Sequence, residues 1–412
     1  MREMKDSGIP WIGEIPKEWE IFPVKYYFTI GRGRVISVFD LVENGKYPVY
    51  SSQTENDGCF GFLNTYDYCG PAITWTTDGA KAGTVFLRDG KYNCTNVCGI
   101  LQLRKQYKAK SNLSFLTYAI GMVANQNKRY DINGFKIMSN EMANIRFGVP
   151  PISEQNRIAD YLDTKCARIN SIRKNVEAEI EALKQYKKSV ITEAVTKGLD
   201  KDVEMKDSGI PWIGEIPKDW KTDKFKYHLK RSEPRNPGNQ VVLSLYRDYG
   251  IIPKDSRDDN HNVTSEDTSN YKYVQIGDFV VNKMKAWQGS VAVSNYEGIV
   301  SPAYYVYKFS DHQIYKKYLH YLLRACYKDE FMRLSGGLRV GQWDLSADGL
   351  GNTYILIPPY DEQVKIANYL DNKVARIDSI IQKKQELLTN LDTYKKSLIY
   401  EYVTGKKEVP AV

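Results

Sequence analysis

The feature that most constrains this chain is a long stretch that occurs twice. The first copy runs from Pro150 to Thr196, and the second runs from Pro358 to Thr404, 208 positions later and without a gap. Each copy begins Pro-Pro-x-x-Glu-Gln and then contains neither Pro nor Gly. Apolar residues follow at three–four spacing, which predicts one long helix per copy with a coiled-coil seam. The predicted seam residues are Ile158, Leu162, Ile169, Ile172, Val176, Leu183, Tyr186, Val190, Ile366, Leu370, Ile377, Ile380, Leu387, Leu391, Tyr394 and Leu398.

The starts and lengths of these helices predict how they are used. Ser153 and Asp361 suit the N-cap positions, and Glu154 and Glu362 follow in the first turn, where an acid favours the helix dipole. At 1.5 Å per residue, each helix would span roughly 60–65 Å. A narrow apolar stripe of that length needs a second long helix, so we expect the two copies to pair antiparallel as a rigid spacer. Matched register over the whole length argues against two unrelated surface helices.

A second repeat supports a two-part plan. Residues 3–19 return as residues 204–220, with Asp219 in the place of Glu18. The prolines and glycines of this segment exclude a regular helix or a central strand. We expect an extended arm that Trp11, Ile12 and Trp19 anchor onto an apolar surface. The arm would pack either on its own domain or on a partner, and both interpretations stay open.

Between the repeats lie two segments with β-like runs followed by a helix, at about 20–149 and 221–357. They look like two diverged copies of one α+β domain. The first is predicted to have strands at 47–52, 72–77, 84–87 and 97–103 and a helix at 113–123. The second is predicted to have strands at 241–245, 273–276, 279–282, 290–293 and 304–309 and a helix at 314–334.

The order arm, domain, helix, arm, domain, helix predicts a tandem duplication around a pseudo-two-fold axis. The expected fold class is therefore α+β, with two domains separated by two long antiparallel coiled-coil helices. The expected parts are an arm with the first domain at 1–149, a spacer helix at 150–200, an arm with the second domain at 201–357, a spacer helix at 358–405 and a tail at 406–412.

Composition narrows the class of protein. The chain has 412 residues, of which 42% are hydrophobic, and a formal net charge of +8. This mild positive charge permits a nucleic-acid partner without requiring one. The sequence has neither an apolar run that could span a membrane nor a signal-peptide core at its start, so we expect a cytoplasmic protein. Four of the six cysteines precede residue 100, and buried thiols are favoured there over a zinc site.

Catalytic motifs are absent from the sequence. There is no phosphate-binding P-loop, no zinc-protease motif and no nucleophile elbow, and all four histidines lie in the second half. Pro358-Pro359-Tyr360 resembles the catalytic motif of amino-methyltransferases, which place a polar residue before Pro-Pro to hold the target amino group. Here Ile357 stands in that place, so the two prolines more plausibly end a strand and open a helix.

Basic and polar residues interleaved with aromatics give candidates for DNA contacts. Lys and Arg contact phosphates or guanine, and Gln pairs with adenine, although solvated loop charge is the alternative for each residue. In the first domain the candidates are Thr76, Thr77, Lys81 and Lys136. In the second they are Lys283, Lys285, Trp287, Gln288, Arg339 and Gln342.

Over essentially residues 1–405, the chain resembles the specificity subunits of type I restriction–modification enzymes. The two Pro-Pro-x-x-Glu-Gln junctions at 150–155 and 358–363 carry this resemblance, together with the Gly-Ile-Pro-Trp-Ile-Gly-Glu-Ile-Pro arms at 8–16 and 209–217 and the segment Gly298–Tyr304.

The resemblance implies a non-catalytic DNA reader. Each domain would be a target-recognition domain for one half of a split, asymmetric site, and the helices would set the gap. Two modification subunits would bring S-adenosylmethionine and methylate adenine, and restriction subunits would bring ATP and Mg²⁺, with no cofactor in this chain. Candidate docking residues for the partners are Trp11, Arg168, Arg173, Trp212, Arg376 and Lys383. The alternatives are a two-headed protein-binding scaffold and an enzyme of the methyltransferase or nuclease type.

Overall fold

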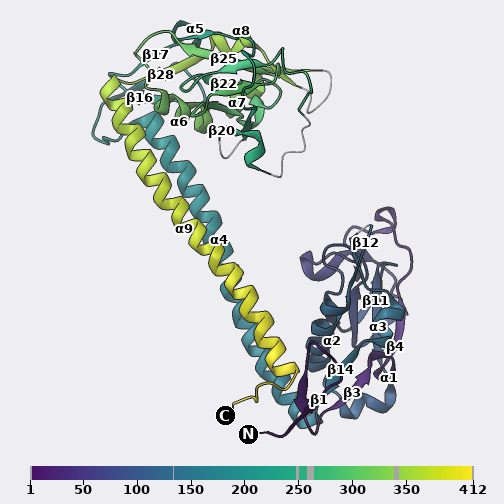
Figure 1. The fold of residues 1–412 in the computed structure, drawn as a ribbon. Helices are drawn as coiled ribbons and strands as arrows, with labels where there is room; N and C mark the ends of the chain where they lie inside the picture. The colour runs from purple at the N-terminus through teal and green to yellow at the C-terminus, as the bar shows by residue number, and fades with distance from the viewer. Residues whose placement is uncertain (1, 133, 247–249, 258–263, 338–342, 411–412) are drawn as a thin grey trace. The chain divides into compact units, whose positions relative to one another are not determined.

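The structure is a computed structural model that describes residues 2–132, 134–246, 250–257, 264–337 and 343–410 (Figure 1). Contacts divide the chain into two compact units. Unit 1 comprises Met1–Val176 and Gln385–Val412, and unit 2 comprises Glu177–Lys384. Each unit therefore holds one arm, one domain and a part of each long helix.

Both copies of the long repeat are helical, as predicted. The first is α4 (Ile152–Lys197) and the second is α9 (Tyr360–Val403). Both helices begin one residue before the predicted caps, because the carbonyl of Pro151 already accepts a hydrogen bond from the N–H of Glu154 at 2.9 Å, and the carbonyl of Pro359 accepts one from Glu362 at 2.9 Å. Ser153 therefore lies inside the first turn, and so does Asp361.

Within each unit, α4 and α9 run antiparallel side by side (Figure 1). In unit 1, Lys395 donates to Asn170 at 2.8 Å, and Arg173 pairs with Asp392 at 3.3 Å. As the residue number falls along α4, the number of its partner on α9 rises, which is the register of an antiparallel pair. Unit 2 shows the same order, since Lys187 contacts Asp378 and Lys384 contacts Glu179.

The predicted seam is only partly correct. The buried members are Ile158, Leu162, Ile169, Val176, Val190, Ile366, Leu370, Ile377 and Leu398. The predicted members Ile172, Tyr186, Ile380, Leu387 and Tyr394 are instead 38–55% exposed. An α-helix has 3.6 residues per turn, whereas the apolar pattern of a coiled coil repeats every 3.5 residues. A row of apolar residues on a straight helix therefore gradually leaves the line of contact. Ile180, which the pattern did not include, is buried in its place.

The domain of unit 1 is built on the four-stranded sheet β4-β11-β8-β9, which is antiparallel throughout. Helix α2 covers one face and forms a core with Ile73, Trp75 and Leu101 of the sheet. A second sheet, β6-β5-β10-β7, lies beside the first. The bounds are β4 (Phe28–Arg32), β5 (Tyr47–Tyr50), β6 (Cys59–Leu63), β7 (Tyr68–Cys69), β8 (Ala72–Thr76), β9 (Val85–Arg88), β10 (Lys91–Cys94), β11 (Cys98–Leu103) and α2 (Leu113–Asn127).

The domain of unit 2 repeats this plan. Its main sheet has the order β18-β25-β22-β23, again antiparallel, and helix α6 packs on it. The bounds are β18 (Leu229–Arg231), β19 (Leu243–Tyr246), β20 (Gly250–Pro253), β21 (Lys272–Val274), β22 (Phe279–Asn282), β23 (Val291–Val293), β24 (Gly298–Val300), β25 (Tyr304–Phe309) and α6 (Lys316–Cys326). The matching strand orders support two diverged copies of one domain, although the smaller sheets differ.

The single helix predicted at 314–334 is wrong. The chain forms α6 and then α7 (Lys328–Arg333), because Tyr327 between them leaves the helical region with ψ near 5°. Its ring is fully buried, and its hydroxyl donates to the carbonyl of Tyr354 at 2.8 Å. This tertiary contact overrides the local helical pattern.

The arms form hairpins that pack on their own units. The first pairs β1 (Met4–Asp6) with β2 (Glu14–Pro16), and the second pairs β15 (Met205–Asp207) with β16 (Glu215–Pro217). Short strands then connect each arm to its domain's exit strand: β3 (Glu20–Pro23) pairs with β14 (Arg146–Val149), and β17 (Lys221–Lys224) pairs with β28 (Tyr354–Ile357). The other α-helices and strands are α1 (Val24–Tyr27), β12 (Arg129–Asp131), β13 (Gly134–Lys136), α3 (Ser139–Asn144), α5 (Phe225–His228), β26 (Ser335–Gly336), β27 (Asp344–Leu345) and α8 (Ala347–Asn352). Short 3-10 helices are η1 (Val38–Asp40), η2 (Glu55–Gly58), η3 (Lys105–Lys110), η4 (Lys254–Ser256) and η5 (Ala286–Gln288).

The described residues contain neither a helix that could cross a membrane nor a cluster of metal ligands. No helix among them combines the length and the apolar character that a membrane crossing needs. No group of three or more His, Cys, Asp or Glu side chains in the described ranges is arranged as metal ligands. Cys94 and Cys98 are buried free thiols, whereas Cys69 is exposed.

Candidate nucleic-acid interface

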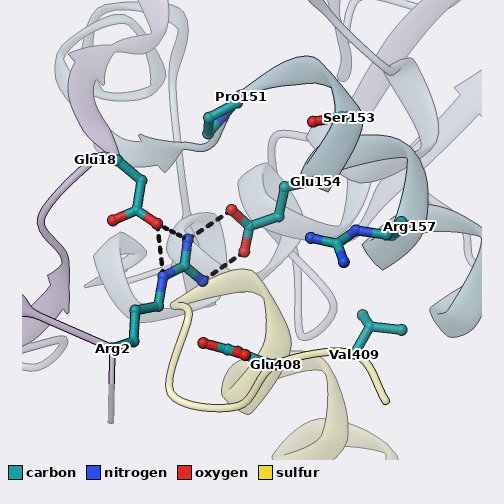
Figure 2. A pocket seen from close by; sticks show the side chains of 8 residues that line it. All are labelled: Arg2, Glu18, Pro151, Ser153, Glu154, Arg157, Glu408 and Val409. Carbon is teal, nitrogen blue, oxygen red and sulfur yellow. Dashed lines mark hydrogen bonds and ion pairs between the residues drawn. The ribbon is translucent and has the colours of Figure 1, made fainter. Parts of the chain in front are cut away.

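The Pro-Pro-x-x-Glu-Gln junction of unit 1 joins the arm to the helix through its glutamate. Glu154 accepts a hydrogen bond from the indole N–H of Trp19 at 3.1 Å, and the guanidinium of Arg2 reaches the same carboxylate at 2.6 and 2.7 Å. Arg2 also pairs with Glu18. Figure 2 shows these charges meeting at one wall of a cavity of about 300 Å³ that Arg157 and residues 408–409 also line. Glu154, with Glu18, raises the pKa of Arg2, so this guanidinium stays charged.

The glutamine of the motif binds only main-chain groups. In unit 1, the amide of Gln155 contacts the N–H of Asn112 at 2.9 Å and the carbonyls of Lys110 and Pro150 at 3.1 and 2.9 Å. In unit 2, Gln363 contacts the N–H of Tyr315 and the carbonyls of Gln313 and Pro358, each at 2.8 Å. Both glutamines are buried. The motif therefore fixes the start of each long helix to the segment that leads into the domain helix.

The second junction lacks one charge. Glu362 accepts a hydrogen bond from the indole of Trp220 at 2.9 Å. The position that corresponds to Arg2 holds Val203. Burial raises the pKa of Glu362, and the Trp220 hydrogen bond only partly opposes this effect. Both junctions therefore join a tryptophan to the motif glutamate, but only the first also pairs that glutamate with an arginine.

The candidate DNA contacts lie elsewhere, at one edge of each main sheet. In unit 1, β8 ends at Thr76 opposite Cys98, where β11 begins, and β4 ends at Arg32 opposite Gly99. The segment 77–83 leaves the sheet at this edge, and the turn at 95–97 enters it there. We call this the strand-end edge of unit 1.

Thr76 and Thr77 shape this edge from within. The hydroxyl of Thr76 donates to the carbonyl of Lys81 at 2.7 Å, and the hydroxyl of Thr77 donates to Asp78 at 2.5 Å. Both threonines are buried, which argues against the direct DNA contact that the sequence predicted for them. Lys81 is exposed at the tip of the loop that they hold.

The hairpin of β12 and β13 is attached to the same loop. The N–H of Gly79 donates to the carbonyl of Phe135 at 3.0 Å, and the N–H of Ile137 donates to the carbonyl of Thr77 at 3.0 Å. Lys136 lies on this hairpin and pairs with Asp131 at 3.2 Å. The structure thus brings the elements that carry Lys81 and Lys136 together.

Unit 2 has the corresponding edge. β22 ends at Asn282 opposite Tyr304, where β25 begins, and the loop 283–290 follows. The carbonyl of Lys283 accepts a hydrogen bond from the N–H of Leu345 at 2.9 Å, which joins the loop to the hairpin of β26 and β27. The ammonium of Lys283 contacts Asp344 at 2.9 Å.

Within the loop of unit 2, Trp287 lies against Trp343, with ring centroids 5.6 Å apart, and its indole donates to the carbonyl of Met284 at 3.0 Å. Lys285 and Gln288 are exposed. Arg339 and Gln342 fall outside the described residues. Two segments that the sequence showed no reason to connect, 283–288 and 343–345, therefore form one surface.

Sequence reasoning missed two further segments at the strand-end edge of unit 1. The segment 33–42 leaves β4 there, and Arg34 bridges to Thr95. The segment 51–58 leaves β5, and the hydroxyl of Thr95 donates to Ser51 at 2.9 Å. Buried Arg88 holds this second segment by contacts to Asp57 at 2.6 and 2.7 Å. The pairing of β10 with β5 and the contacts of Thr95, all of them long-range, place the two segments together.

The predicted docking residues are dispersed. Arg168, Arg376 and Lys383 are exposed on the long helices, whereas Arg173 is engaged with Asp392. In the arms, Trp11 is partly buried against the core of unit 1, and Trp212 is 41% exposed and stacks edge-on against Tyr327. The arms therefore pack internally, at least in part.

A family model described as "Type I restriction modification DNA specificity domain" matches residues 16–182 and 225–389. The two matches cover more than half of the chain and one of them falls on each domain with its helix. The chain belongs to this family.

Known relatives share this assignment. A putative type I specificity subunit of Mycoplasma pneumoniae is 36% identical over 45% of this chain and 58% of its own length, so the match spans just over half of that relative. A type I restriction enzyme specificity subunit of Methanocaldococcus jannaschii is 26% identical over 96% of this chain and 94% of its own length.

Solved structures agree in fold. One chain from a study of complex assembly in a type I restriction–modification system has a TM-score of 0.68 at 14% identity, covering 95% of this chain and 99% of its own. The HsdS subunit of Thermoanaerobacter tengcongensis has a TM-score of 0.50 at 15% identity, covering 95% of this chain and 98% of its own. These likenesses show that the chain shares its fold with both structures.

Proposed function

We propose that this chain is the non-catalytic DNA specificity subunit of a type I restriction–modification complex, and that each domain reads one half of a split site. The observation that carries the proposal is a contrast within the chain. The two domains share the sheet order and the junction motif, but their strand-end edges carry different side chains. A shared frame with unlike loops suits two unlike half-sites.

The chemistry of the edges supports DNA as the ligand. Lys81 and Lys136 in unit 1, and Lys283 and Lys285 in unit 2, would contact phosphates or guanine. Gln288 would pair with adenine, and Trp287 would pack beside a base. The relatives bear the name of specificity subunits, which agrees with a reader whose partners perform the chemistry.

Exchange of domain 221–357 with that of a relative tests this proposal directly. Methylated adenines would be mapped in a host that expresses the partner subunits. We expect one half of the methylated sequence to change and the other half to persist. A change in both halves, or in neither, would contradict the assignment of one half-site to each domain.

The partners proposed are two modification subunits, which would bring S-adenosylmethionine, and restriction subunits, which would bring ATP and Mg²⁺. Unit 1 offers an apolar surface for docking. Ile172 lies between Asn170 and Arg173, which contact Lys395 and Asp392 of α9. It is therefore at the same height along the helix pair as Tyr394, which is exposed. Both side chains of this pair are exposed to solvent and not buried between the two helices.

Unit 2 repeats that surface. Exposed Tyr186 immediately precedes Lys187, and exposed Ile380 lies two residues after Asp378, the partner of Lys187. Two copies of one apolar pair would suit two copies of one subunit. Changing Tyr186 and Tyr394 to Ser should weaken co-purification with the modification subunit, whereas Asn175→Ser, at another exposed position of α4, should act less. Unchanged assembly of the double variant would remove this surface from consideration.

A two-headed protein scaffold is the alternative function. DNA binding releases counterions, so affinity for DNA should fall steeply as salt rises. A scaffold would show no specific DNA complex at any salt concentration.

A further inference from the structure

We propose that Phe39 is an apolar wedge that inserts between two base pairs of the first half-site. The proposal rests on the function proposed above and adds a reading mode to it. Phe39 is 99% exposed, which is unusual for a large apolar side chain. Its neighbours Val35 and Val38 are also exposed, so the segment presents an apolar ridge to solvent.

The turn that carries Phe39 is rigidly held. Ser37 accepts a hydrogen bond from the N–H of Phe39 at 3.1 Å, and Asp40 accepts one from the N–H of Ser37 at 2.6 Å. These two bonds form a reciprocal capping box. On either side, Ile36 and Leu41 point inward and pack into a small core with Val49 and Leu63. The exposure of Phe39 is therefore a consequence of a fixed turn and not of a loose loop.

The start of the segment that carries the turn favours DNA as its ligand. The segment 33–42 leaves β4 at the strand-end edge, and the N–H of Gly33 donates to the carbonyl of Cys98 at 3.1 Å. At the same edge, the N–H of Thr77 donates to the carbonyl of Val97 at 3.2 Å, at the start of the loop that carries Lys81. The segment that carries Phe39 thus starts at the surface that would meet DNA.

A phenylalanine at such a surface has a known physical use. Apolar side chains that enter between base steps unstack them and kink the duplex. Pyrimidine–purine steps deform most readily, so a wedge selects for them without a hydrogen bond to any base. Phe39 would therefore impose a preference for a flexible step in the first half-site. The loop that follows β18 in unit 2 begins Ser232-Glu233-Pro234 and carries no aromatic residue before Tyr246, so the second half-site would lack this preference.

The test uses the full chain in complex with its modification subunits and duplexes that contain the mapped site. 2-Aminopurine is placed at successive steps of each half-site, away from the methylated adenines, and its fluorescence reports unstacking. The wild-type complex should raise fluorescence at one step of the first half-site. Phe39→Ala should abolish that rise, weaken binding about tenfold and relax the sequence preference at that step, whereas Phe39→Leu should retain part of each effect.

Tyr26→Ala is the matched control. Tyr26 is an aromatic residue of the same unit that is 56% exposed, but it lies on α1, at the other end of β4. This variant should bind and unstack as the wild type does. Unchanged fluorescence and affinity in Phe39→Ala would overturn the wedge, and so would a loss of subunit assembly with unstacking intact. If the wild-type complex bound neither half-site specifically, the proposed function itself would fail.

Discussion

The ammonium of Lys187 lies 2.7 Å from the carboxylate of Asp378, and the same position of the repeat, 208 residues on, places Lys395 2.8 Å from the amide oxygen of Asn170. The two contacts are copies of one interaction between α4 and α9. Unit 2 has kept it as an ion pair, and unit 1 has it as a hydrogen bond to a neutral acceptor.

This difference predicts that Asn170→Asp stabilises unit 1. The new carboxylate would pair with Lys395 as Asp378 pairs with Lys187, and partly exposed pairs contribute about 0.5 kcal/mol. Thermal unfolding should shift upward by about 1 °C, and the gain should shrink at high salt. Asn170→Ala, which supplies no acceptor, should give no gain, and an equal shift in both variants would point away from the ion pair.

The junction glutamines should be among the most sensitive positions of the chain. Gln363→Ala leaves one N–H and two carbonyls without their buried partner, so we expect a loss of about 3 kcal/mol in the free energy of unfolding. Urea denaturation measures this loss. Gln385→Ala, at an exposed position of α9, should change stability by less than about 0.5 kcal/mol. Similar losses in the two variants would contradict the role of the buried contacts.

Glu362 predicts a pH-dependent stability. Because burial raises its pKa in the folded chain, the charged form costs stability above that pKa, and the cost disappears as pH falls below the unfolded value of about 4.3. Glu362→Gln keeps an acceptor for Trp220 and should raise the unfolding midpoint at neutral pH, with a gain that fades towards pH 4. Glu154→Gln should instead destabilise by about 1.5 kcal/mol, because Arg2 loses its ion pair. A destabilising Glu362→Gln would show that the helix dipole outweighs burial.

The lysines of the second strand-end edge should differ in their contribution to DNA binding. Lys283 is already paired with Asp344, whereas no ion pair of Lys285 is found among the described residues. Lys285→Ala should reduce the slope of log affinity against log salt by about one, and Lys283→Ala by less. Fluorescence anisotropy at several KCl concentrations gives both slopes. Equal slopes would mean that DNA displaces Asp344.

The sequence predicted the long helices and most strands because their signals are local and repeated. Neither helix contains Pro or Gly, and the second copy confirmed the register of the first. The same periodicity misplaced Ile172 and Tyr186 in the seam, because a helix flanked by one partner buries only part of its apolar stripe. The break at Tyr327 could not be predicted from the local pattern, because a tertiary hydrogen bond causes it.

The candidate site was predictable only in fragments. The loops around Lys81 and Lys285 were identified from their composition, but their attachment to hairpins depends on backbone hydrogen bonds between distant segments. Nothing local shows that Thr76 and Thr77 are buried and not exposed to DNA. Phe39 was not among the candidates from the sequence, and only the inward packing of Ile36 and Leu41 explains why its side chain is exposed.

The contacts of Gln155 and Gln363 have a consequence for how such chains can evolve. The sequence repeats the glutamine, and in each unit its hydrogen bonds go to one N–H and two carbonyls of the main chain. A domain whose backbone follows the same path into its helix could form the same hydrogen bonds with the glutamine, whatever side chains it carries at those positions. Recombination between related genes at the Pro-Pro boundary would therefore yield a folded hybrid in a single event. A lineage could acquire a new recognition sequence by exchange, without passing through unstable intermediates.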